Sequence, residues 1–225
     1  MLRHAGLDVP RTLDEALDLE RTALLVYDMQ VGILRQLREP ETIVARVADV
    51  LGAAREVGLR TYFCRHTSLP KNLMGRFQMR QALAWQRADG PDAVTPWFLR
   101  GAPAVEVTPE LAPLETEAVF DKLAMSAFEG TPLDFALRDC DVRTLVVVGV
   151  AVEVGIEPTV RHAADLGYVP VVVEDACGAG HAEAGTRALA SLRFMGDALF
   201  TTVDELAAAL RAQAAARDAA RPGGA

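Results

Sequence analysis

The stretch that decides the fold is TLVVVGVAVEVGIEPT, which runs from Thr144 to Thr159. It contains an unbroken aliphatic run, Leu145 to Val148, and such a run predicts a strand buried on both faces. Gly149 ends the run, and the apolar spacing of Ile156 and Val160 predicts a helix after it. A buried strand that leads through a tight turn into a helix places backbone N–H groups at the carboxyl edge of a sheet. Open α/β folds bind their ligands at this edge.

Two other stretches are expected to reach the same edge. TALLVYDMQ (Thr22–Gln30) predicts a second buried strand that ends on Asp28, and AVFDKLAMSAFEGTPLDFAL (Ala118–Leu137) carries Lys122 just past a third strand. Alone, Asp28 is also compatible with a helix cap or a turn, and Lys122 with a solvated loop. In one cleft, however, a carboxylate and an ammonium group would each shift the other's protonation, which is typical of a functional site.

The rest of the chain alternates strand and helix patterns. Residues 1–21 are polar and are expected to wrap the surface. The further predicted strands cover residues 59–64, 168–174 and 198–201, and the further predicted helices begin near residues 40, 131, 182 and 202. This alternation predicts a mainly parallel sheet in a three-layer α/β/α sandwich. We expect one domain over residues 1–210, followed by a low-complexity tail, 211–225, that frays.

Composition limits the possible functions. The chain has 225 residues, enough for one domain with a sizeable core, and its formal net charge of −8 argues against binding nucleic acid or an anionic membrane. We find neither the pattern of a signal peptide nor an apolar run near the ~20 residues of a membrane-spanning helix. Cys64, Cys140 and Cys177 show no CxxC spacing. They are interpreted as reduced thiols of a cytoplasmic protein, and Cys140 and Cys177 as small buried apolar residues.

At three places in the right order, the sequence resembles the isochorismatase-like hydrolases, a family that includes the cysteine hydrolases. The matching segments are LLVYDMQ, KLAMSAFEGTPLDFAL and LVVVGVAVEVGIEPTVRHAADLGYVPVVVEDA, within residues 20–210. The resemblance implies a six-stranded parallel sheet in Rossmann-like order, a small-molecule substrate and a homo-oligomer, either a dimer or a tetramer. It also implies a cis peptide bond between Val150 and Ala151, in an anion-binding turn formed by Val150, Ala151 and Gly155.

The chain departs from the cysteine hydrolases at the position of their nucleophile. In most members, residues matching Asp28 and Lys122 activate a cysteine, but here that position is Gly155, which cannot form a covalent intermediate. Isochorismatases, which cleave a vinyl ether by protonation and addition of water, also resemble this chain in having glycine there. However, Met125 and Ala151 stand where aromatic substrate contacts are expected. The hypothesis is therefore a hydrolase that uses Asp28 and Lys122 for acid–base chemistry on a small, anionic substrate. A catalytically silent binding protein and an amidase that uses water as nucleophile are the alternatives.

Residues 65–100 break the strand and helix pattern and are interpreted as a lid over the cleft. His66 is either a substrate contact or a surface residue. Arg76 and Arg80 either clamp a substrate carboxylate or lie on a solvated helix face. Trp85 and Trp97 either wall the pocket or pack against a second subunit. The segment CRHTSLPKN lacks the Asp-x-His metal ligands of nicotinamidase-type relatives, so we expect no metal and no other cofactor.

Overall fold

The main sheet has six parallel strands in the order β5-β4-β3-β6-β7-β8. The structure is a computed structural model that describes residues 1–220. The strands of this sheet are β3 (Thr22–Tyr27), β4 (Arg60–His66), β5 (Ala118–Lys122), β6 (Thr144–Val150), β7 (Val169–Gly178) and β8 (Leu199–Thr201). Counted along the chain, this is the order of a doubly wound Rossmann-like sheet. The predicted sandwich, its six parallel strands and their order are confirmed.

The two central strands are the two stretches with the most continuous apolar character. Every residue of β3 and of β6 is buried, and the two strands pair from Thr22 with Thr144 to Tyr27 with Gly149. A parallel strand covered by helices on both sides of the sheet has no solvent-facing side, which explains why the apolar runs do not alternate with polar residues.

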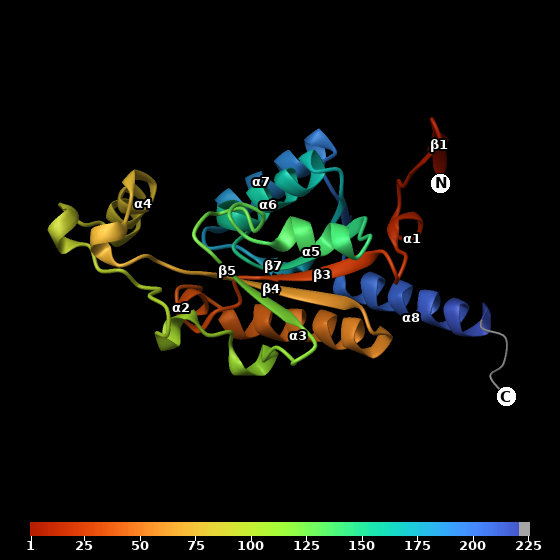
Figure 1. The fold of residues 1–225 in the computed structure, drawn as a ribbon, viewed down its shortest axis with the longest axis horizontal. Helices are drawn as coiled ribbons and strands as arrows, with labels where there is room; N and C mark the ends of the chain where they lie inside the picture. Colours follow the sequence, from red (N-terminus) through yellow and green to blue (C-terminus); the bar gives the residue numbers. More distant parts are fainter. Residues whose placement is uncertain (221–225) are drawn as a thin grey trace.

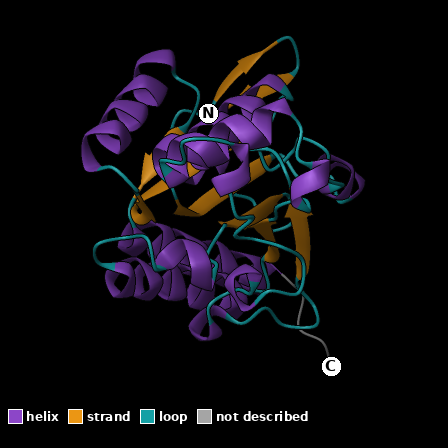
Figure 2. Cartoon of the chain, turned by 90° about the vertical axis from the view of Figure 1, so that its left-hand side faces the viewer, coloured by secondary structure: helices purple, strands orange, loops and turns teal. Residues whose placement is uncertain are grey.

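Helices cover both faces of the sheet. Helices α3 (Pro40–Val57) and α8 (Val203–Ala220) lie on one face, and α5 (Leu133–Asp139), α6 (Glu157–Asp165) and α7 (Ala182–Met195) lie on the other (Figure 1). Figure 2, seen from the side on which α4 lies, shows the strands between these helices. Leu24 and Val26 of β3 point into the core beneath α3 and α8, while Ala23 and Leu25 point into the core beneath the other layer. Alternate residues of each strand therefore serve separate cores.

The helix ends follow the residues that the sequence offers. Pro40 occupies the first turn of α3, and Gly58 ends this helix with a left-handed φ of +72°. Before α8, Thr202 Oγ1 accepts from the Glu205 amide and Glu205 Oε2 accepts from the Thr202 amide. This reciprocal pair is a capping box.

Both ends of the chain contain secondary structure that the sequence pattern does not predict. Residues 1–21 contain a short antiparallel hairpin, β1 (Leu2–His4) with β2 (Leu7–Val9), and the helical turn α1 (Leu13–Ala16). Helix α8 extends through the first ten residues of the predicted fraying tail, to Ala220, because Arg217 donates to the Val57 carbonyl and Ala214 packs on the core. The remaining tail residues, 221–225, lie outside the described part of the chain.

The predicted lid contains its own short helices. After β4 come η1 (Lys71–Leu73), α4 (Arg76–Gln86) and η2 (Pro91–Ala93), and the chain returns through η3 (Pro103–Val105) and η4 (Pro109–Leu111) to β5. Helix α4 stands away from the three layers, and all its side chains remain at least partly exposed (Figure 1). A second short helix, α2 (Val31–Leu34), follows β3. The lid therefore joins the body at the edge of the sheet where β3 and β4 end.

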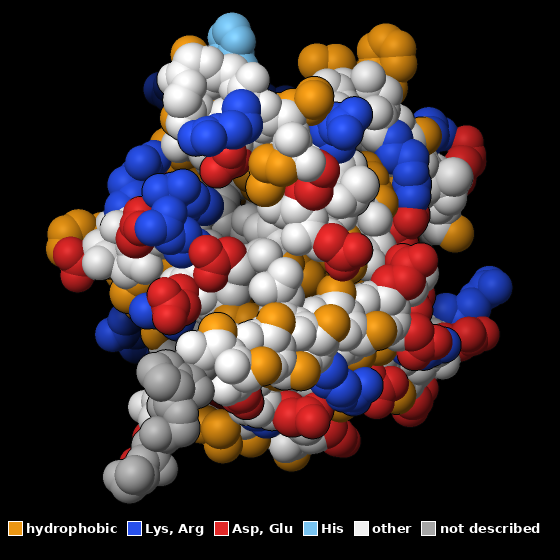
Figure 3. Space-filling view, turned by 90° about the vertical axis from the view of Figure 1, so that its right-hand side faces the viewer, with side chains coloured by type: hydrophobic (Ala, Val, Ile, Leu, Met, Phe, Trp, Pro, Cys, Tyr) orange, Lys and Arg blue, Asp and Glu red, His pale blue; other side chains and the backbone are white. Residues whose placement is uncertain are grey.

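The end of the molecule opposite the lid has no surface of a single charge sign. The face with the N-terminal hairpin and the end of α8 shows acidic and basic side chains side by side (Figure 3). Among residues 1–220, no helix combines the length and the apolarity needed to cross a bilayer.

Candidate active site

Three neighbouring strands, β5, β4 and β3, end at one edge of the sheet and bring the side chains at their ends together. His66 ends β4 and Lys122 ends β5, and these two residues are paired in register. Asp28 follows β3 directly and adopts a left-handed φ of +49°, while its amide still donates to the Cys64 carbonyl at 3.1 Å. Aspartate tolerates this conformation better than most residues, so the chain can turn out of the sheet at this point.

Asp28 and Lys122 form a buried ion pair. The distance from Lys122 Nζ to Asp28 Oδ2 is 2.8 Å, and the exposed fractions of the two side chains are 0% and 8%. Lys122 Nζ also donates to the Ala124 carbonyl at 3.3 Å and lies 4.4 Å from the centre of the Tyr27 ring. The two residues are 94 positions apart in the sequence. The contact that we expected between them is present.

Burial controls the charge of Asp28. Removal from solvent raises the pKa of the Asp28 carboxyl, and this effect exceeds the opposing attraction of Lys122 and the hydrogen bonds to the carboxylate. One of these hydrogen bonds comes from Cys64 Sγ, 3.7 Å from Asp28 Oδ1. A carboxyl group in this environment retains a proton at a higher pH than an ordinary aspartate, which suits proton donation.

Cys64 is a neighbour of Asp28 that the sequence pattern does not place in the site. Burial, and after it the negative Asp28, raise the pKa of the Cys64 thiol well above its ordinary value. A thiol held protonated in this way is a poor nucleophile. Because Cys64 pairs with Tyr27 in the register of β3 and β4, only the alignment of the strands reveals it.

A cavity of about 490 Å³ opens above the ion pair. From the body of the molecule, Tyr27, Asp28, Met125, Val150 and Ala151 line it. The lid contributes aromatic and basic side chains, namely His66, Trp85, Arg87, Trp97 and Phe98. The lid therefore borders the cleft as expected, and both of its tryptophans form part of the wall.

The arginine of the lid that lines the cavity is not one of the two that we expected. Arg76 and Arg80 lie on the exposed surface of α4, and neither lines the cavity. Arg87 does, because it ends α4 in a left-handed conformation with φ of +50°. The helical spacing of Arg76, Arg80 and Arg87 would place all three on one face of a continuous helix, but Arg87 lies at the C-cap, where the left-handed backbone ends the helix. The proposed carboxylate contact therefore moves from Arg76 and Arg80 to Arg87.

The Gln30 side chain fixes the backbone of His66. Gln30 Oε1 accepts from the His66 amide at 2.7 Å, and Gln30 Nε2 donates to the carbonyls of His66 and Val105, each at 2.9 Å. Gln30 thereby joins the end of β4 to the end of η3. The His66 ring packs edge-on against Phe98, and within the described chain its Nδ1 atom is buried without a hydrogen-bond partner. Burial, and after it Lys122, lower the pKa of His66 to about 3, so the ring is neutral at neutral pH.

The turn after β6 has the predicted cis peptide bond between Val150 and Ala151. A π-helical turn, η5 (Val152–Ile156), follows it and contains Gly155. The Gly155 amide donates to the Ala151 carbonyl at 3.0 Å. In the predicted anion-binding turn, this amide is therefore already occupied, whereas Val150 and Ala151 face the cavity.

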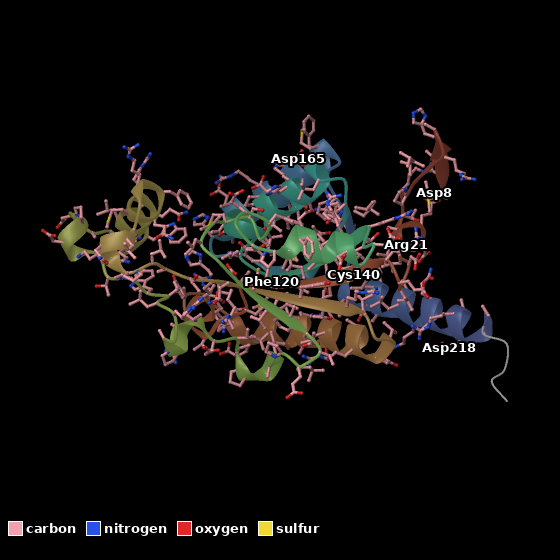
Figure 4. All side chains as sticks on the ribbon, in the orientation of Figure 1. Asp8, Arg21, Phe120, Cys140, Asp165 and Asp218 are labelled. Carbon is pink, nitrogen blue, oxygen red and sulfur yellow. The ribbon has the colours of Figure 1, made fainter. Side chains whose placement is uncertain are left out.

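The other two cysteines lie away from the ion pair. Cys140 lies between α5 and the start of β6, towards the edge of the sheet where Arg21 precedes β3 (Figure 4). Cys177 lies on β7 with Sγ 3.5 Å from the Val147 carbonyl, and burial raises the pKa of its thiol. All three cysteines are free. Within residues 1–220, no three His, Cys, Asp or Glu side chains are grouped so that they could hold a metal ion.

Comparisons with known proteins agree with this site and fold. The family model described as Isochorismatase domain matches residues 22–205. The chain is 30% identical over 178 residues to the uncharacterized isochorismatase family protein YecD of Escherichia coli O157:H7, covering 74% of this chain and 85% of the relative. It is 29% identical over 173 residues to the ureidoacrylate amidohydrolase RutB of Cronobacter sakazakii, covering 70% and 74%.

A solved structure supports the same relationship. A cysteine hydrolase from Pseudomonas syringae pv. phaseolicola 1448A superposes with a TM-score of 0.74 at 26% identity, over 88% of this chain and 96% of that chain. The matched family segment contains the Asp28–Lys122 pair and Gly155. The chain therefore belongs to the isochorismatase family of hydrolases.

Proposed function

We propose that this protein hydrolyses a small anionic substrate with Asp28 as proton donor and Lys122 as electrostatic partner, without a covalent cysteine intermediate. The observation that carries the proposal is the buried Asp28–Lys122 pair, of which Asp28 lines the cavity, in a chain that has glycine at position 155. The raised pKa of Asp28 favours a donor role for its carboxyl group. Arg87 at the cavity wall favours a negatively charged substrate.

The substrate class that fits a proton donor without a nucleophile is a vinyl ether of the isochorismate type. Asp28 gives its proton to the terminal carbon of the enol ether, and the adjacent carbon becomes an oxocarbenium ion. Water adds to this carbon and returns one proton to the Asp28 carboxylate. The hemiketal then breaks its C–O bond, so that one water molecule is consumed and a ketone and an alcohol are released. Lys122 favours the carboxylate form of Asp28 during the step in which the positive oxocarbenium ion exists.

A second candidate is hydrolysis of an amide or carbamoyl group by water at the same pair. It is supported by the relative from Cronobacter sakazakii, whose name describes a ureidoacrylate amidohydrolase. In this case, Asp28 would first accept a proton from the attacking water and then return it to the leaving nitrogen. The vinyl-ether mechanism requires the protonated carboxyl of Asp28, whereas the amide mechanism requires its carboxylate. The pH dependence of the rate therefore separates the two candidates.

The test is turnover of a panel of vinyl ethers, ureido compounds, amides and esters by the purified protein and by its Asp28→Asn variant. Asp28→Asn keeps the shape of the side chain but removes its proton transfer, so the rate should fall by a factor on the order of a hundred or more. Asp8→Asn, on the N-terminal hairpin, is the matched control and should leave the rate unchanged. Equal turnover by wild type and Asp28→Asn would remove Asp28 from the mechanism. If the wild type binds panel members but turns none of them over, the silent binding protein is the correct alternative.

A thiol-alkylating reagent adds a second measurement to this test. Because Cys64 is buried, Cys177 is half-buried and holds its proton, and Cys140 lies towards the other edge of the sheet, full alkylation of exposed thiols should leave the rate largely intact. Complete loss of activity upon labelling one cysteine, prevented by substrate, would contradict a mechanism without a thiol. The cytoplasmic location that the cysteines suggest stays a prediction.

A further inference from the structure

Tyr27 lies at the junction of the ion pair, the cavity and the turn after β6. It is the last residue of β3 and is only 1% exposed, yet its ring borders the cavity. Lys122 Nζ lies over this ring, and the Tyr27 hydroxyl donates to the Met125 carbonyl. The side chain therefore contacts both the ion pair and the loop that carries Met125.

The Tyr27 ring also fills the space next to Gly155. A Cβ atom added to Gly155 would lie 2.5 Å from Cε1 of Tyr27, and closer still to Cζ and the hydroxyl oxygen. Carbon atoms that are not bonded to each other do not approach so closely, and the ring of a buried tyrosine packed between strands and helices cannot rotate away. Gly155 itself is buried, at the end of the π-helical turn. No side chain can occupy position 155 while Tyr27 keeps this place.

We infer that Tyr27 and Gly155 form a matched pair in which the phenol fills the room that a side chain at position 155 requires, so that Tyr27 determines the class of chemistry available to the cavity. The catalytic part of this inference rests on the proposed function, whereas its steric part does not. A side chain at position 155 would lie where the phenol oxygen of Tyr27 now lies. That oxygen belongs to the ring over which Lys122 lies. Tyr27 thus keeps a nucleophile out of the neighbourhood of Asp28 and Lys122.

Tyr27 does not replace the missing nucleophile. Burial, and after it the negative Asp28, raise the pKa of the Tyr27 phenol well above its ordinary value. The hydroxyl keeps its proton and acts as a hydrogen-bond donor to the Met125 carbonyl. Its contribution is to occupy space and to position the Met125 loop.

The steric part is tested by a double-mutant cycle on thermal unfolding. Gly155→Ala should lower the melting temperature of the full-length protein by about 3–10 °C, because it overpacks the core. In a Tyr27→Val background, all the ring atoms near position 155 are gone, and Gly155→Ala should cost less than half as much. Tyr27→Phe is the matched control: it removes only the hydroxyl, so the ring carbons still collide and the cost should remain. Equal costs of Gly155→Ala in the Tyr27→Val and Tyr27→Phe backgrounds would overturn the inference.

The consequence for chemistry is tested with an introduced thiol. In Tyr27→Val/Gly155→Cys, the new thiolate should displace iodide from iodoacetamide at least about tenfold faster than in Tyr27→Phe/Gly155→Cys, since in the latter the ring blocks it. Peptide mass spectrometry assigns the label to residue 155 and separates it from the three native cysteines. Equal labelling in both backgrounds would contradict the role of Tyr27.

The two proposals can fail separately. Unfolding and labelling require no turnover, so they judge the Tyr27–Gly155 pair even if the panel finds no substrate. Conversely, a strong coupling between Tyr27 and Gly155 together with unchanged turnover in Asp28→Asn would uphold the pair and reject the proposed function.

Discussion

Two effects oppose each other at Asp28: burial raises the pKa of its carboxyl group, and Lys122 at 2.8 Å lowers it. If the protonated carboxyl is the donor, kcat/KM should be high at low pH and should fall as the pH rises through the pKa of Asp28 in the folded protein. Lys122→Met removes the lowering effect, so the falling limb should move to higher pH while the maximal rate drops. The pH–rate profiles of both proteins check this. A limb that moves to lower pH would show that Asp28 is not the titrating group.

His66 makes a prediction about acid stability. Its pKa in the folded state, about 3, is below the ordinary value of 6.5, so folding favours the neutral ring. This contribution is fully present above pH 6.5 and is lost as the pH falls towards about 3. His66→Gln should therefore flatten the decline of the unfolding free energy in this range, by up to about 1.4 kcal/mol per pH unit. Denaturant titrations at a series of pH values measure this slope. His4→Gln on the exposed hairpin is the control, and an equal change in both variants would contradict a special role of His66.

At the scale of elements, α4 places one arginine of the lid at the cavity. If the substrate carries a carboxylate, Arg87→Ala should raise its KM about threefold to tenfold, with little effect on the melting temperature, because Arg87 is exposed. Arg76→Ala and Arg80→Ala on the same helix are matched controls and should leave KM unchanged. Steady-state kinetics with the panel substrate that is turned over fastest measures these KM values. A larger effect of Arg80→Ala than of Arg87→Ala would show that Arg80, and not Arg87, contacts the substrate carboxylate.

At the scale of the whole molecule, the exposed apolar side chains of the lid favour the homo-oligomer that the family resemblance implies. Leu73 and Phe77 are more than half exposed, on a segment that stands away from the body (Figure 1). We propose that a second copy of the chain packs against this segment. Light scattering at micromolar concentration should give the mass of a dimer or a tetramer, and Phe77→Glu should reduce it.

The competing surface for self-association lies on the helical layer that contains α5 and α7. Phe135 of α5 and Phe194 of α7 are also exposed, with 73% and 87% of their surface accessible. If Phe194→Glu dissociates the oligomer and Phe77→Glu does not, the interface lies on α7 and the lid is free. A monomer in both the wild type and the variants would refute the oligomer altogether.

The sequence by itself determined the central part of the molecule. The aliphatic runs of β3 and β6 identify buried parallel strands, since only such strands are covered on both faces. Pro40, Gly58 and the pair Thr202–Glu205 mark helix ends by local chemistry. The meeting of Asp28 and Lys122 was also predictable, because the carboxyl ends of parallel strands lie at one edge of a sheet. All of these features depend on neighbours in the sequence or on the general geometry of a parallel sheet.

Only the tertiary structure decided which side chains meet across that edge. The choice of Arg87 over Arg80 depends on the left-handed C-cap that ends α4 at Arg87 and on where the lid lies relative to the body, which helical periodicity leaves open. The contact of Cys64 with Asp28 follows from the register of β3 and β4, and the filling of the space at Gly155 by Tyr27 follows from the packing of η5 on β3. A sequence pattern records whether each residue is buried, but not which distant residue fills the space beside it. For this reason the glycine was visible in the sequence and its partner was not.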